Sequence, residues 1–273
     1  MPYARRSDLT LYFEQEGEGD PSLLFVHGWC CDHSFFEPQF EHFKSTCTVT
    51  TLDLRGCGSS SRPEGGYDIP GLADDLKWLC GELGIVHPVV IGHSLGGVIG
   101  IEIAARHPTL PRAIVGVDPG PINPTPESQQ TFEGFVAEME GPSGEDVRRA
   151  WVEATAGPTV SDDLRRRVVD TMCSVPLSVA IAVIRGVVEW NGVAALGMCD
   201  VPVAVLQSAT GGDNDPSRLV PLKADLYFGL TVGAGHFHQL EVPDQVTAMI
   251  DRFLQLVVPH SSASSVDAGH RST

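Results

Sequence analysis

The feature that most constrains this chain is a short apolar run followed at once by a glycine-rich turn. Residues 89–91 read Val-Val-Ile, and residues 92–97 read Gly-His-Ser-Leu-Gly-Gly. Glycine on both sides of a serine is typical of a strand that bends directly into a helix, because the two backbones leave no room for a Cβ. Such a turn strains the serine backbone and exposes its hydroxyl above a sheet. The pattern predicts that Ser94 is a nucleophile.

The rest of the chain alternates between strand-like and helix-like segments. Short apolar runs such as residues 23–26 are typical of strands covered on both faces, whereas leucines at helical spacing mark residues 72–83 as a helix. This alternation predicts an α/β fold with a doubly wound, mostly parallel sheet, whose sites lie at the carboxyl ends of its strands. Strands are expected at 9–16, 23–26, 49–54, 89–91, 113–117, 201–206 and 225–232, and helices at 72–83, 98–106 and 244–257.

From residue 121 to residue 192 the strand-like runs disappear. We expect residues 121–192 to form a helical cap over the site, inserted into a core domain made of residues 1–120 and 193–258. The serine-rich tail 259–273 has no apolar periodicity and is expected to be disordered. Four helical stretches are expected in the cap, at 127–140, 145–156, 161–173 and 177–190.

The composition is that of a globular protein with an acidic surface. Of the 273 residues 42% are hydrophobic, and the formal net charge is −17. This charge repels phosphate backbones and anionic lipids, so neither nucleic acid nor a membrane is expected as a partner. No apolar run reaches the ~18 residues of a membrane helix, and we identify no signal peptide, so a cytoplasmic protein is expected. We expect a monomer or a homodimer.

The cysteines and other ligand-type residues show no metal-site spacing. The seven cysteines are scattered and include no C-x-x-C pair, so reduced and mostly buried thiols are expected. Since no cluster has the spacing of metal ligands, neither a metal nor another cofactor is expected. The expected partner is a small-molecule substrate.

A serine hydroxyl attacks poorly without a base, and one histidine is well placed to serve as that base. His236 lies within residues 233–237 (Gly-Ala-Gly-His-Phe), just after the last expected strand. A loop there can carry the imidazole back over the sheet, and the ordinary pKa of histidine suits proton transfer near neutral pH. His236 is therefore predicted to be the general base, whereas His27 and His93 are expected to orient loops.

Two backbone amides are predicted to form an oxyanion hole. In a turn of this type one N–H comes from the residue after the nucleophile, which is Leu95. The other comes from the loop after an early strand, and residues 27–29 (His-Gly-Trp) follow the strand at 23–26. The Trp29 amide is therefore predicted to be the second donor, while its indole remains able to pack.

The acid that orients the histidine has three candidates. Asp118 ends the strand that follows the serine turn and its helix, whereas Asp213 and Asp215 come after the next strand. Little room is left between Asp215 and His236 for a full helix and a strand, so we prefer Asp118. Asp213 and Asp215 stay as alternatives. Asp118 could instead cap a helix or form a turn before Pro119, and Asp213 and Asp215 could instead form an Asx turn.

Together these motifs resemble the α/β-hydrolase fold family over residues 9–257. The resemblance implies a doubly wound, mostly parallel sheet with a helical cap inserted after the sixth strand, and a nucleophile, acid and base in the chain order Ser, Asp, His. Most members carry the acid after the later strand, while lactonase-like, dehalogenase-like and some oxygenase-like members carry it at the position of Asp118. Serine at 94 differs from the aspartate of epoxide hydrolases and dehalogenases. The motifs lie at residues 27–29, 53–60, 92–97 and 235–237.

The resemblance implies hydrolysis of a carboxylic ester or lactone through an acyl-enzyme on Ser94. A small, largely apolar substrate would meet inward-facing apolar residues of the cap, although such residues also form the ordinary packing face of a helix. Substrate contact is predicted for Trp29, Phe132, Trp151 and Trp190. The wider set of inward cap residues is Phe132, Phe135, Met139, Trp151, Met172, Val179, Ile184 and Trp190.

Two other functions fit the same residues. A cofactor-free oxygenase or C–C bond hydrolase could use the pair of His236 and Asp118 to deprotonate an aromatic hydroxyl group, with Ser94 only assisting. A non-catalytic ligand receptor of the same fold could use the cap as a signalling surface, because a fold alone does not fix a function.

Overall fold

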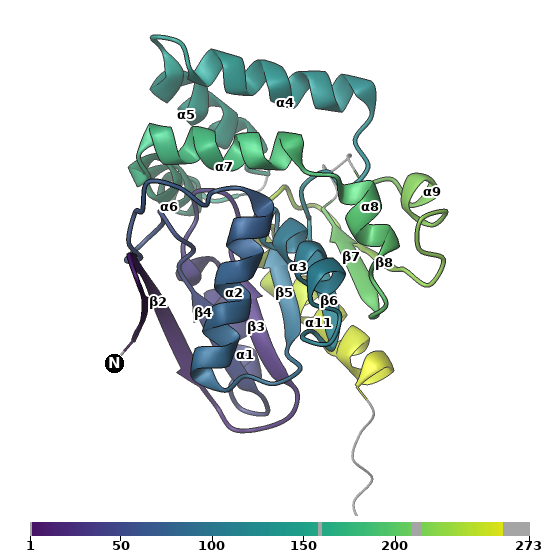
Figure 1. Cartoon of the computed structure of the whole chain (residues 1–273). Coiled ribbons are helices and arrows are strands. Elements are labelled where there is room, and N and C mark those ends of the chain that lie inside the picture. The colour runs from purple at the N-terminus through teal and green to yellow at the C-terminus, as the bar shows by residue number, and fades with distance from the viewer. Residues whose placement is uncertain (1, 158–159, 209–213, 259–273) are drawn as a thin grey trace, which may run out of the picture.

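The computed structural model describes residues 2–157, 160–208 and 214–258 (Figure 1). The strands within these residues are β1 (Tyr3–Arg6), β2 (Leu9–Glu16), β3 (Ser22–Val26), β4 (Thr48–Leu52), β5 (Val89–His93), β6 (Ala113–Val117), β7 (Val203–Gln207) and β8 (Tyr227–Leu230). They form one sheet in the order β1-β2-β4-β3-β5-β6-β7-β8. The pairs β1–β2 and β2–β4 are antiparallel and the other pairs are parallel. The predicted mostly parallel sheet is confirmed.

The central strands are buried on both faces because their side chains alternate between two apolar layers. In β3, Leu23 and Phe25 belong to one layer and Leu24 and Val26 to the other, and all four are 1% exposed or less. A continuous apolar run is what a strand covered from both sides requires. The covering helices are α1 (Glu37–Phe43) and α11 (Pro243–Val257) on the first face, and α2 (Ile69–Leu83), α3 (Leu95–Arg106) and α8 (Gly192–Gly197) on the second.

Four helices follow β6, the sixth strand, and lie across the top of the sheet in Figure 1. We call them the cap helices: α4 (Pro126–Met139), α5 (Gly144–Thr155), α6 (Asp162–Ser174) and α7 (Leu177–Glu189). Thr125 and Ser161 begin α4 and α6 with side-chain caps, and α5 packs between α4 and α6 while α7 packs on α4. Among the described residues no single helix is long and apolar enough to cross a bilayer, and α6 with α7 passes that test only as a pair bent by 94°.

The predicted elements all have counterparts in the structure, with ends that shift by a few residues. The elements that the sequence patterns did not reveal have four to seven residues, and a segment this short shows too little periodicity to be recognised. The predicted disordered tail 259–273 lies outside the described residues. The unpredicted elements are β1, α1, α8, η1 (His33–Phe36), α9 (Pro216–Leu219) and α10 (His238–Glu241).

A tight bend from β5 into α3 holds Ser94 above the sheet. Ser94 has φ 50° and ψ −112°, a conformation that a residue with a side chain adopts only under constraint. A Cβ on Gly96 would lie 2.0 Å from the carbonyl oxygen of Val26, and one on Gly92 would lie 2.1 Å from the carbonyl oxygen of Gly96. The bend therefore requires glycine at both positions, as the sequence pattern predicts.

Replacing Gly96 tests this contact. We expect Gly96→Ala to lower the free energy of unfolding by about 3 kcal/mol or more, because its methyl group would collide with backbone that cannot move independently. Gly81→Ala is the matched control, since nothing lies within 4 Å of a Cβ at that position of α2. Alanine there should stabilise the helix by roughly 1 kcal/mol. Urea unfolding measures both variants, and a Gly96→Ala protein as stable as the wild type would contradict the contact.

Candidate active site

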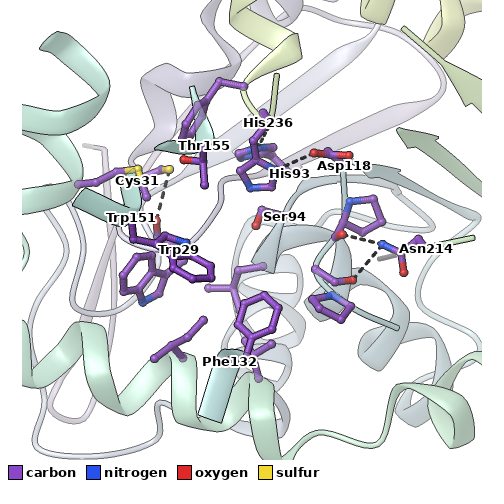
Figure 2. Close-up of a pocket in the computed structure, with 18 of the residues that line it drawn as sticks. Trp29, Cys31, His93, Ser94, Asp118, Phe132, Trp151, Thr155, Asn214 and His236 are labelled. Carbon is purple, nitrogen blue, oxygen red and sulfur yellow. Dashed lines mark hydrogen bonds and ion pairs between the residues drawn. The ribbon is translucent and has the colours of Figure 1, made fainter. Parts of the chain in front are cut away.

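Asp118 and His236 come from different strand ends and meet at the carboxyl edge of the sheet. Asp118 directly follows β6, and His236 lies between β8 and α10. His236 Nδ1 is 2.7 Å from Asp118 Oδ2. When Nδ1 carries the proton it donates to the carboxylate and leaves Nε2 as an acceptor. Figure 2 shows this pair above Ser94, which lines the same cavity.

Ser94 and His236 share the cavity without a hydrogen bond between their side chains. Within the described residues the Ser94 hydroxyl has no hydrogen-bond partner, whereas its backbone N–H donates to the Val117 carbonyl at 3.0 Å. Nucleophile–base contacts commonly tighten only when substrate is present. The structure therefore leaves the hydroxyl available and holds its backbone in place from β6.

The Asp118 carboxylate is buried and has two further donors, both on Ser208. The Ser208 N–H donates to Oδ1 and the Ser208 hydroxyl to Oδ2, each at 3.0 Å. Asp118 itself has φ 43°, and its N–H donates to the Leu206 carbonyl at 2.6 Å. Burial raises the pKa of Asp118, but the hydrogen bond and charge of His236 and the Ser208 amide outweigh it and bring the pKa to about 2. The carboxylate is ionised at neutral pH and faces His236.

Two buried histidines hold the loops around the site. His93 Nε2 donates to the carbonyl of His236 at 2.9 Å, and burial holds the pKa of His93 well below its ordinary value. His27 Nε2 accepts from the Leu54 N–H at 2.9 Å, and its Nδ1 donates to the Gly28 carbonyl at 2.8 Å. Burial also lowers the pKa of His27, so both imidazole rings are neutral. Each ring hydrogen-bonds to backbone groups of the neighbouring loops.

Trp29 and Leu95 line the cavity, and their backbone N–H groups have no acceptor among the described residues. Leu95 begins α3, so its N–H has no partner within the helix. Trp29 lies in the loop after β3, and this loop passes close to the serine: a Cβ on Gly28 would lie 3.3 Å from Ser94 Cβ. Within the described residues neither amide donates to a protein acceptor. Both groups are free to bind an oxygen on a substrate.

A cavity of about 330 Å³ lies between the sheet edge and the cap helices. Ser94 and His236 line it from the core, together with Trp29, whose indole Nε1 donates to the Ala180 carbonyl of α7 at 2.8 Å. Four of the predicted inward cap residues also line the cavity: Phe132, Trp151, Met172 and Ile184. Figure 2 shows Phe132 and Trp151 among them. The wall is mostly apolar, as expected for a small-molecule site.

The structure does not bring Trp190 into this cavity. Its indole Nε1 donates to Glu102 Oε2 at 2.8 Å, and the ring lines a separate groove beside α8. Trp190 follows the last residue of α7, where the chain returns to the core, so the inward face of the helix no longer fixes its direction. Phe135, Met139 and Val179 are buried but likewise do not line the cavity; Phe135 stacks on Trp151 with ring centroids 4.1 Å apart.

Of the two alternative acids, the described structure includes Asp215, which does not contact His236. Asp215 is exposed, and its side chain accepts from the Ser217 N–H at 2.7 Å to begin α9. Its role is therefore to cap α9, where the sequence had suggested an Asx turn as the alternative. Asp213 lies outside the described residues.

Four polar or thiol side chains of the cavity wall were not predicted from the sequence: Cys31, Thr155, Gln207 and Asn214. Asn214 Nδ2 donates to the Pro119 carbonyl at 2.8 Å and its Oδ1 accepts from the Ile122 N–H at 3.0 Å. Asn214 thus fixes the segment directly after Asp118. The only signal for it is its place after a strand, in the same stretch as the two alternative acids.

The described residues contain no group of three or more His, Cys, Asp or Glu side chains arranged to hold a metal ion. All seven cysteines are free, and six of them are buried. Burial raises the pKa of the thiols of Cys30 and Cys31 well above the ordinary value. These thiols are neutral at neutral pH, and their side chains serve as apolar wall and core.

The low pKa of Asp118 predicts that its ionised carboxylate stabilises the folded protein and that this contribution is lost in acid. Since the folded pKa is about 2 and the ordinary value is 3.8, the stability that ionised Asp118 supplies is complete above the ordinary value and is lost as the pH falls toward 2. The difference corresponds to about 2 kcal/mol. Urea unfolding between about pH 5 and pH 2.5 should show a shallower acid loss for Asp118→Asn than for the wild type. Parallel curves for the two proteins would contradict this pKa.

Comparison with known proteins agrees with the fold. The solved enol-lactonase of Burkholderia xenovorans superposes with a TM-score of 0.80 at 20% identity and covers 93% of this chain and 99% of that one. The strigolactone esterase of Arabidopsis thaliana is 27% identical over 251 residues, which is 87% of this chain and 94% of the relative. The 2-(acetamidomethylene)succinate hydrolase of Mesorhizobium japonicum is 36% identical over 118 residues.

The last of these matches spans only 42% of either protein. Two further relatives that are 40% and 35% identical are likewise matched over 37% and 44% of their length, so the chain spans less than half the length of these three curated relatives. The model of the alpha/beta hydrolase fold family matches residues 21–165, which hold the serine turn and Asp118. Because this match covers more than half of the chain, the protein belongs to the α/β-hydrolase fold family.

Proposed function

We propose that this protein hydrolyses carboxylic esters or lactones of small, uncharged and largely apolar substrates through an acyl-enzyme on Ser94. The observation that carries the proposal is the 2.7 Å contact between His236 and Asp118 at the cavity that Ser94 also lines. A nucleophile, a base and an acid that orients the base are the parts that acyl transfer requires. Relatives named as an esterase and a lactonase support the same reaction class.

In the first half of the reaction Ser94 Oγ attacks the carbonyl carbon of the substrate. His236 Nε2 accepts the hydroxyl proton, and the Asp118 carboxylate stabilises the imidazolium that forms. The carbonyl oxygen gains negative charge and binds the amides of Trp29 and Leu95. One such donor is commonly worth about 3 kcal/mol of the activation barrier. His236 then gives its proton to the leaving alcohol, which departs as the acyl-enzyme forms.

In the second half water replaces the alcohol. His236 removes a proton from the water as its oxygen attacks the acyl carbon, and the same two amides hold the second oxyanion. The proton returns to Ser94 Oγ as the acid product leaves. For a lactone the alcohol and the acid are ends of one molecule, so the product is a hydroxy acid.

The cavity wall supports an uncharged substrate. No lysine or arginine lines the cavity within the described residues, and Asp118 is its ionised group. Burying a substrate carboxylate there would leave a charge without a partner, which is strongly unfavourable. The relative from Mesorhizobium japonicum is named for a succinate, a dicarboxylate. We propose that this chain acts on a different, neutral substrate class.

A matched pair of esters tests the substrate class. The ratio kcat/KM for p-nitrophenyl butyrate should exceed that for the p-nitrophenyl hemisuccinate by at least roughly 100-fold, because the second ester carries an unpaired carboxylate into the cavity. Ser94→Ala should abolish the burst of p-nitrophenol with the first ester. Equal rates on the two esters would contradict the uncharged substrate class. No hydrolysis of neutral esters or lactones, or oxygen uptake that survives Ser94→Ala, would contradict the proposed reaction.

Two aspartate variants test the proposed acid. Asp118→Asn should lower kcat by about 10³- to 10⁴-fold with little change in KM, because asparagine favours the wrong tautomer of His236 and does not stabilise its charge. Asp215→Asn is the matched control and should keep the wild-type kcat, since Asp215 is exposed at the start of α9. Steady-state kinetics on p-nitrophenyl butyrate measures both. A large loss in Asp215→Asn with none in Asp118→Asn would transfer the role to the later strand.

A further inference from the structure

A single carboxylate, that of Glu241, holds the loop around His236 and also contacts the cap. Glu241 lies in α10 and is half-buried. Its Oε2 accepts from the Gly235 N–H at 2.9 Å, and its Oε1 accepts from the Phe237 N–H at 3.3 Å. These amides belong to the two neighbours of His236. Oε1 also accepts from the N–H of Gly157, two residues beyond the end of α5, at 3.3 Å.

The same two segments are joined by a direct backbone contact. The His236 N–H donates to the carbonyl of Thr155, the last residue of α5, at 3.2 Å. Carbonyls in the last turn of a helix have no partner within the helix, so His236 supplies one from outside. A Cβ on Gly157 would lie 2.1 Å from Glu241 Oε2 and 2.5 Å from the Gly235 nitrogen. The backbone of the cap at Gly157 therefore packs directly against the backbone of residues 235–237, which we call the histidine loop.

The charge of Glu241 has no cationic partner within the described residues. The three amides are the groups that bind it. A carboxylate accepts several N–H groups at once, and its charge strengthens each bond. A glutamine would offer one carbonyl oxygen and would turn its own NH₂ group toward the amide donors. A side chain with two acceptor oxygens is thus the one that suits this position.

We propose that Glu241 is a positioning residue for catalysis: by binding both neighbours of His236 and the cap backbone at Gly157, it makes the placement of the base depend on the cap. The proposal rests on the proposed function, because it assigns a consequence for that reaction. On its other side His236 is fixed by His93 and Asp118. Loss of Glu241 would leave the bond from the His236 N–H to the Thr155 carbonyl as the remaining hydrogen bond on the cap side, so the imidazole would shift relative to Ser94.

Kinetics of two carboxylate variants test the proposal. A misplacement of about 1 Å costs on the order of 10²-fold in rate, so Glu241→Gln should lower kcat for p-nitrophenyl butyrate by about that factor, with a much smaller change in KM. Glu140→Gln is the matched control, because Glu140 pairs with Arg185 on the cap and does not contact the histidine loop. It should keep the wild-type kcat and KM. A wild-type kcat in Glu241→Gln, or a loss confined to KM, would overturn the proposal.

A variant on the cap side tests whether the effect passes through the same contact. Gly157→Ala places a methyl group against Glu241 and Gly235, so it should lower kcat by a similar factor. Because the two changes break one contact, the double variant should lose little more than either single variant. Losses that multiply would show that the residues act independently and would overturn the coupling. Should Glu241→Gln fail to fold, Gly157→Ala carries the kinetic test alone, and a wild-type kcat in it overturns the proposal.

Hydrogen–deuterium exchange gives a readout that needs no turnover. In the free protein, Glu241→Gln should speed exchange of the Gly235, Phe237 and Gly157 amides together, while Glu140→Gln leaves all three unchanged. Faster exchange at the loop without a change at Gly157 would overturn the link to the cap. A wild-type protein that hydrolyses no ester or lactone would refute the proposed function, and the exchange result would still decide whether Glu241 joins the two segments.

Discussion

The site depends on the close contact between the end of β3 and the start of α3. The carbonyl of Val26 lies where a side chain on Gly96 would have to be, so the helix can begin directly against the strand. This contact places the loop of Gly28 and Trp29 beside Ser94, and it leaves the Leu95 amide without an acceptor among the residues that the structure describes. A strained serine and two unoccupied donors therefore arise from one backbone arrangement. The proposed base, His236, follows β8, and the proposed acid, Asp118, follows β6.

His236 is where three parts of the molecule meet. Its side chain contacts Asp118 at the end of β6, its carbonyl accepts from His93 in the serine turn, and its N–H donates to Thr155 in the cap. Each anchor alone leaves the loop some freedom, whereas the three together fix both the backbone and the ring. Glu241 further restrains the loop by accepting from the Gly235 and Phe237 N–H groups on either side of His236. In the proposed reaction, a cap that encloses substrate and also contacts the loop around His236 would link substrate binding to the geometry of proton transfer.

The strands, the serine turn and the cap helices could be predicted because each rests on a local requirement. Glycine beside Ser94 reports a steric limit that the structure shows at Gly96, and alternating burial explains the apolar runs of the central strands. Chain spacing favoured Asp118, and the structure brings it to His236. The choice was open because strand order, not sequence distance, decides which carboxylate is adjacent.

Other features of the site depend on tertiary contacts that no local pattern reports. Helical periodicity identifies an apolar face but not what covers it, which is why Trp190 was expected at the cavity while its indole binds Glu102. Asn214 and Glu241 act by binding backbone groups that are 95 and 84 residues away in the chain. The helix that carries Glu241 has four residues and gives no periodic signal. Such residues are found only once the loops are placed.

A phosphonate that reacts with the nucleophile would show whether Ser94 and the two amides act together. The protein would be treated with a p-nitrophenyl alkylphosphonate, which mimics the tetrahedral intermediate, and the crystal structure of the adduct determined. We expect phosphorus bonded to Ser94 Oγ, with the phosphoryl oxygen about 2.7–3.1 Å from the amide nitrogens of Trp29 and Leu95. His236 Nε2 should face the bonded oxygen. A phosphonate on another residue, or a Ser94 adduct whose oxygen points away from both amides, would contradict the account.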